Sequence, residues 1–167
     1  MVSCSTEDTA PSTQNDKVAV QFTGGISVNT RAAGVAWADG DRIGIFMTEA
    51  GKTLSADVIK EGVDNVCYQS NGSIAFSPVS GGKTVFFPID GDVDFYSYYP
   101  QTTVNDYKVA LDVTDQTKQE TIDFMYAKTE GCNKATPQVD LKFFHKLSNL
   151  ILDVQPGNGL TDRKSVV

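Results

Sequence analysis

Apolar and polar residues alternate along most of the chain, which is the pattern of strands that bury one face. The first run, residues 17–22, places Val18, Val20 and Phe22 on one side. Clusters of Gly, Pro and Asp separate the runs, as turns do. The predicted strands are residues 17–22, 37–47, 73–78, 84–88, 93–100, 107–113, 123–128 and 139–154. Strands at this spacing predict an antiparallel β-sandwich of about seven to eight strands.

Two stretches could be helical, residues 54–61 and 115–121, but neither has an apolar stripe wide enough to cover a sheet. Gly44 lies inside the second strand, where it indicates a bulge or a close backbone approach. The last run moves its apolar residues to the other face at Ser148 and Asn149, which requires a bulge or a break.

The first strand is joined to the second by a linker, residues 23–36, that contains a lone arginine, Arg31. A single proteolytic cut in this linker would leave Val18, Val20 and Phe22 held by non-covalent contacts alone. The sequence therefore predicts a strand that one cut could detach.

The length of 167 residues suits one hydrophobic core, which we place in residues 17–167. Residues 1–16 hold no apolar side chain larger than alanine after Cys4, so we expect a flexible tether there. The net charge of −7 argues against a nucleic-acid partner. No apolar run approaches the roughly 20 residues that span a bilayer.

Met1, Val2 and Ser3 before Cys4 resemble the end of a bacterial lipoprotein signal. We therefore expect Cys4 to be acylated and to anchor the chain to the outer membrane; the alternative is a free thiol near the terminus. Cys67 and Cys132 could pair in an oxidising envelope, and the sequence leaves that question open. The three cysteines and one histidine do not form a zinc-binding pattern.

The candidate chemistry is sparse. His145 has no nucleophile motif beside it, and we expect a core histidine satisfied by the backbone. Asp90–Asp94 resembles the start of a calcium loop but lacks its later ligands, so we interpret it as a hairpin turn. Alternation places Phe95 and Tyr99 on the core face of their strand, and Tyr96 and Tyr98 on the other. We predict no enzyme, no cofactor and no metal site.

Four segments together resemble the fimbrillin-like proteins of Bacteroidales, the subunits of protease-assembled pili. The second strand is similar to their W-x-x-GD-x-IG-V/I-F stretch, and the other three segments follow in the same order and spacing. These segments are Trp37–Phe46, Phe86–Pro88 with Val93–Pro100, Asp123–Ala127, and Leu141–Leu150.

This resemblance implies a transthyretin-like β-sandwich, export as a lipoprotein, and a location in the surface fimbrium. It also implies that an arginine-specific protease removes the first strand, which places the processing site at Arg31 and Ala32. The open groove would then accept a strand from another fimbrial subunit, as a homo- or heteropolymer. The family's usual second sandwich is absent from these residues, so the resemblance implies a chain that accepts a strand rather than one that donates it.

A rival hypothesis is a monomeric surface lipoprotein, an adhesin that binds a glycan or a host protein through exposed aromatic residues such as Tyr96 or Tyr98. Resistance of polymer bands to SDS after cleavage at Arg31 would separate the two hypotheses.

Overall fold

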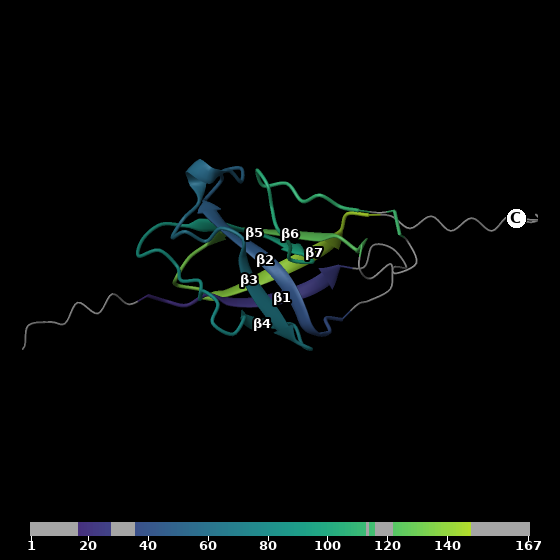
Figure 1. Ribbon diagram of the computed structural model, residues 1–167. Coiled ribbons are helices and arrows are strands. Elements are labelled where there is room, and N and C mark those ends of the chain that lie inside the picture. The colour runs from purple at the N-terminus through teal and green to yellow at the C-terminus, as the bar shows by residue number, and fades with distance from the viewer. Residues whose placement is uncertain (1–16, 28–35, 113, 116–121, 148–167) are drawn as a thin grey trace, which may run out of the picture.

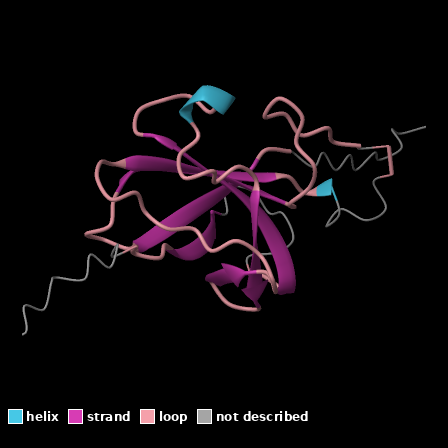
Figure 2. Ribbon diagram, turned by 60° about the vertical axis from the view of Figure 1, so that its left-hand side comes forward, coloured by secondary structure: helices cyan, strands magenta, loops and turns pink. Residues whose placement is uncertain are grey.

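The computed structural model describes residues 17–27, 36–112, 114–115 and 122–147, and within these ranges the regular secondary structure is almost entirely strand (Figure 1). Figure 2 shows the strands forming the body of the molecule, with helix confined to short pieces outside the sheet. The strands are β1 (Gln21–Ser27), β2 (Asp39–Glu49), β3 (Val66–Asn71), β4 (Ala75–Pro78), β5 (Val93–Tyr99), β6 (Met125–Cys132) and β7 (Gln138–His145). The predicted all-β class is confirmed.

The strands form one closed sheet in the order β1-β4-β3-β2-β5-β6-β7. All pairs are antiparallel except β1 with β7, which run parallel and close the ring. The prediction of a purely antiparallel sandwich is therefore wrong at this closure. It failed because alternation shows which residues are buried and carries no information about strand direction.

The core lies inside the ring and follows the predicted alternation. Ile43, Ile45 and Met47 of β2 are fully buried, and β7 buries every second residue from Val139 to Phe143. Within β2 the pairing with β3 is irregular, because its register shifts between Asp39 and Arg42. Gly40 there has a φ of +92°, which favours glycine.

Strand β3 was not predicted. Two predicted strands are not strands in the structure: residues 84–88 make only the bridge Ala19–Phe86, and residues 107–112 form no strand. The first strand begins later than predicted, at Gln21, and continues through Gly24 and Gly25 to Ser27.

The stretch 54–61 contains one 3₁₀ turn, Ala56–Val58. Residues 116–121 and the break predicted at Ser148 and Asn149 lie outside the described residues. Where the structure describes the chain, none of its helices has the length and apolar character needed to span a membrane.

Candidate functional site

β1 closes the sheet and is held unequally on its two sides. It pairs with β7 along its whole length, from Gln21–Gln138 to Ser27–Phe144. On the other side only Phe22 and Thr23 pair with β4. The chain before β1 adds backbone hydrogen bonds to residues 85–87, including one of 3.0 Å from the Val20 amide to the Val85 carbonyl. Loss of β1 would therefore open the ring between β4 and β7.

The apolar side chains of this segment face the core, as the alternation predicted. Val20 and Phe22 are buried and Val18 is half-buried. The Phe22 ring packs edge-on against Tyr68 and Phe95, with 5.1 Å between centroids in each pair. Edge-to-face pairs add to the stabilisation from area burial alone, so Phe22 fits a shaped aromatic socket.

The indole of Trp37 binds the backbone of β1 at Gly24, which is two positions after Phe22. Its Nε1 donates a buried hydrogen bond of 2.7 Å to the Gly24 carbonyl. The indole also packs edge-on against Phe76 and Phe143, with 5.0 Å between centroids in each pair. Trp37 follows the linker, so it belongs to the part of the chain that remains if β1 is detached. The sequence reasoning missed this contact, because no local pattern connects residues on either side of a linker.

Cys4, Arg31 and Ala32 lie outside the described residues. Acylation of Cys4 and cleavage at Arg31 stay predictions. The described chain stops at Ser27, the last residue of β1, and resumes at Ala36, three residues before β2.

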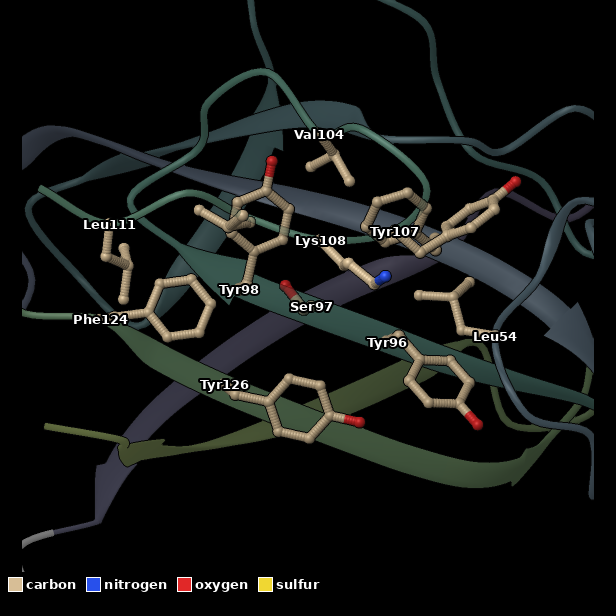
Figure 3. Close-up of a pocket in the computed structure, with 12 residues that line it drawn as sticks. Leu54, Tyr96, Ser97, Tyr98, Val104, Tyr107, Lys108, Leu111, Phe124 and Tyr126 are labelled. Atoms are coloured by element: carbon tan, nitrogen blue, oxygen red, sulfur yellow. The ribbon is translucent and has the colours of Figure 1, made fainter.

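A second hydrophobic cluster lies on the outer face of β2 and β5, against β6 and the segment that follows β5 (Figure 3). It surrounds a cavity of about 350 Å³. Tyr96 and Tyr98 are only 7% and 4% exposed, so the hypothesis that they form an exposed adhesive surface is wrong. They are covered because residues 104–109 fold back over the sheet.

The tyrosine hydroxyls in this cluster hold loops in place. The Tyr96 hydroxyl donates to the Lys52 carbonyl at 2.7 Å. The Tyr98 hydroxyl lies 2.7 Å from both Asn65 Oδ1 and the Thr102 carbonyl oxygen. Burial raises the pKa of Tyr98. The Tyr98 ring also covers Gly44, where an added Cβ would lie 2.3 Å from it. The sequence predicted a bulge or a close backbone approach at Gly44, and the group that lies close is the Tyr98 side chain.

His145 is paired with a carboxylate rather than with the backbone. Its Nδ1 lies 2.7 Å from Asp123 Oδ1, and its side chain is 8% exposed. Among the described residues, Nε2 has no hydrogen-bond partner, so no Ser or Cys nucleophile completes a triad. The prediction of a core position holds, and the prediction of a backbone partner is wrong. Asp123 lies 22 residues before His145, so no local sequence pattern indicated that the two side chains would pair.

Asp90–Asp94 forms a turn, as interpreted, with Gly91 at a φ of +88°. Asp94 is fully buried and its two oxygens accept backbone hydrogen bonds of 2.9 Å each, from Gly51 and from Gly131. Both carboxylate oxygens are thus used within the fold. In the described part of the chain, no group of three or more His, Cys, Asp or Glu residues could hold a metal ion.

Cys67 and Cys132 are both free thiols and do not meet. Cys67 on β3 lies opposite Gly44, on the outer side, whereas Cys132 on β6 packs against the core. Strands β2 and β5 separate β3 from β6 in the ring. A disulfide needs Cα atoms within about 7 Å, so this arrangement excludes one.

The comparisons with known proteins agree on one family. A family model described as fimbrillin-like matches residues 30–166. A curated Bacteroides uniformis protein named as a fimbrium subunit, Fim1C, is 36% identical over 165 residues, covering 93% of this chain and 51% of its own length. This chain thus spans about half the length of that relative.

Two solved structures are similar as well, both described as cell adhesion proteins. One, from Bacteroides uniformis, is 36% identical with a TM-score of 0.61 and covers 78% of this chain and 49% of its own. The other, from Bacteroides ovatus, is 26% identical with a TM-score of 0.53 and covers 78% of this chain and 53% of its own.

Proposed function

Because the chain belongs to the fimbrillin-like family, whose members are structural pilus subunits rather than enzymes, we propose that it is a fimbrial subunit assembled by exchange of β1. On this proposal the chain is exported as a lipoprotein acylated at Cys4, with residues 1–16 as a tether to the outer membrane. Residues 17–167 would then be the family's transthyretin-like N-terminal domain, of which the closed sheet β1–β7 is the described part. Cleavage between Arg31 and Ala32 frees β1, and a strand of another fimbrial subunit replaces it.

The observation that carries this proposal is the position of β1 as the closing strand. Its removal leaves β7 unpaired along the whole length that β1 now covers, and leaves β4 unpaired at Phe76 and Ala75. It also empties the sites of Val20 and Phe22. Unpaired edges beside an apolar slot are the condition for addition of a strand from a neighbouring chain.

The energetics suit a switch that depends on the linker. Burial of Val20 and of Phe22 stabilises the uncut chain by about 1.5–3 kcal/mol each, before ordering entropy is subtracted. While the linker is intact, β1 rebinds at the high effective concentration of a tethered strand. After a cut it competes on equal terms with strands from other chains. The family model begins its match at residue 30, so β1 lies outside the segment that it covers.

The proposal is tested by digestion of the full chain with an arginine-specific protease, followed by mixing with a full-length fimbrial subunit from the same bacterium. We expect SDS-resistant ladders from the cut chain. An Arg31→Lys variant should give neither the cut nor the ladder. Arg42 lies within β2, and Arg42→Lys serves as the matched control that should leave both unchanged. A cut chain that stays monomeric in this mixture would contradict strand exchange.

A further inference from the structure

Gly24 is a glycine for reasons of space alone. Its backbone φ lies outside the left-handed region, so a larger residue would be unstrained there. Glycine also weakens a strand interior, so its presence needs a reason. A Cβ at this position would lie 2.7 Å from the Phe76 ring, 3.2 Å from the Phe143 ring and 3.4 Å from Trp37 Nε1. These three rings form a notch that admits only a bare backbone.

The notch belongs to the part of the molecule that stays behind. Phe76 lies on β4, Phe143 on β7, and Trp37 two residues before β2, so all three follow the linker in sequence. The rings support one another through the edge-on contacts of Trp37, which also reach Tyr99 at 5.4 Å between centroids. Widening the notch would disturb this packing. The buried Nε1–H of Trp37 would also lack an acceptor until a backbone carbonyl returned to the Gly24 position.

Two positions before the notch lies the aromatic socket of Phe22. Its walls, Tyr68 and Phe95, also belong to the remaining part. The Tyr68 ring is fixed from the other side, because its hydroxyl accepts a hydrogen bond of 2.9 Å from the Val85 amide. Residues two apart in a strand share a face, so the socket and the notch contact successive inward positions of the same strand.

We propose that the slot vacated by β1 selects its partner by this pair of sites: it takes a strand of another fimbrial subunit that carries an aromatic residue followed two positions later by glycine. This rests on the proposed function, in that another strand replaces β1. The socket stabilises an aromatic side chain at the Phe22 position of the incoming strand, and the notch excludes every side chain at the Gly24 position.

The sequence makes this requirement selective. Among the 14 glycines of the chain, only Gly24 stands two positions after a Phe, Tyr or Trp. A second copy of these residues can therefore satisfy both sites only with its own β1. A different subunit would satisfy them with any strand that carries the same pair of residues in register.

The test uses the full chain with residues 30–32 replaced by the recognition sequence of a site-specific protease, then nicked. Fluorescein-labelled peptides of residues 17–27 are incubated with it, and incorporation is followed by fluorescence on size exclusion. The peptides carry the native sequence, Gly24→Val or Gly25→Val. Gly25→Val is the matched control, because a Cβ on Gly25 would meet nothing within 4 Å.

We expect the native and Gly25→Val peptides to bind within about twofold of one another, and Gly24→Val to bind at least about tenfold more weakly. A Phe76→Leu variant of the nicked chain, which lacks the nearest ring atom, should narrow the gap between a Gly24→Ala peptide and the native one. Equal binding of the Gly24→Val and Gly25→Val peptides would overturn the proposal.

A failure of the proposed function is distinguishable from a failure of this rule. If even the native peptide does not enter the nicked chain, strand replacement fails. The notch at Gly24 is then tested in the uncut chain, by comparing the melting temperatures of the Gly24→Val and Gly25→Val variants. A lower melting temperature for Gly24→Val alone supports the notch, and equal melting temperatures exclude it.

Discussion

At the scale of single residues, aromatic side chains packed against the backbone require glycine at two strand positions. Gly44 and Gly24 both lie in strands, and each is covered by an aromatic ring that stands where its Cβ would be. The two sites lie on opposite sides of the sheet, Gly24 beneath Trp37 in the core and Gly44 beneath Tyr98 in the outer cluster. The alternation of apolar residues does not reveal either contact.

Gly44→Ala should destabilise the protein by about 1–3 kcal/mol, because the new methyl group would force the Tyr98 ring from its place. That shift would also disturb the contacts of the Tyr98 hydroxyl with Asn65 and Thr102. Urea unfolding measures the loss, with Gly25→Ala as the control that should stay close to the native protein. A loss no larger for Gly44→Ala than for Gly25→Ala would show that the ring moves freely.

At the scale of elements, the buried carboxylate of Asp94 joins the turn after β2 to the end of β6, two segments that are distant in sequence. Gly51 ends the turn after β2, and Gly131 lies near the end of β6. Each donates its amide to one oxygen of Asp94, which itself lies in β5. The side chain thus fixes one end of the ring across three neighbouring strands.

Asp94→Asn should lower the free energy of unfolding by about 2–3 kcal/mol. The asparagine NH₂ group would take the place of one carboxylate oxygen and would face a backbone N–H, so two donors would meet and one hydrogen bond would be lost. The amides of Gly51 and Gly131 should lose protection in hydrogen exchange. Asp90→Asn removes the same charge from a side chain that is 94% exposed, and it should leave both protection and stability nearly unchanged. Equal losses in the two variants would assign the effect to charge alone.

The elements also show what alternation can and cannot predict. It located β2, β5 and β7 because each carries apolar residues at every second position that face the core inside the ring. It also marked residues 84–88, where Val85 and Phe87 are buried as in a strand, although the segment makes only one bridge. Alternation reports which side chains are covered and leaves the hydrogen-bonded partner open. β3 escaped notice because its third inward residue, Ser70, is polar yet buried.

The candidate site divides in the same way. The inward face of Val18, Val20 and Phe22 follows from local spacing and was predicted. The Gly24–Trp37 contact and the parallel pairing with β7 depend on residues that the chain brings together only after folding. The sequence carries no local signal for either.

At the scale of the whole molecule, two half-buried groups that are held in their neutral form, Tyr99 and Cys132, make the fold sensitive to alkaline pH. Burial, together with the nearby Asp94 and Asp92 carboxylates, raises the pKa of Cys132 to about 11. Burial and the Asp41 carboxylate raise the pKa of Tyr99 to about 12. A pKa raised on folding means that the folded state holds its proton more tightly than the unfolded chain does.

Stability from these two groups should therefore be complete below about pH 9 and decline as the pH rises toward 12. Urea midpoints measured at intervals from pH 8 to pH 11 should show the decline. The double variant Tyr99→Phe with Cys132→Ala should decline less steeply, since lysine titration is common to both proteins. Parallel curves would contradict the assignment.

The parallel closure of β1 on β7 has a consequence for the order of folding. Thr23 and Asp140, which bond across this pair, are 117 residues apart. Of the described strands, β1 is synthesised first and β7, its principal partner, is synthesised last. Contacts of such long range are slow to form because their loop-closure entropy is lost before any pairing is gained. β1 is thus the last of the described strands to dock, and the partly folded chain before that step has the same open slot that proteolysis would later recreate.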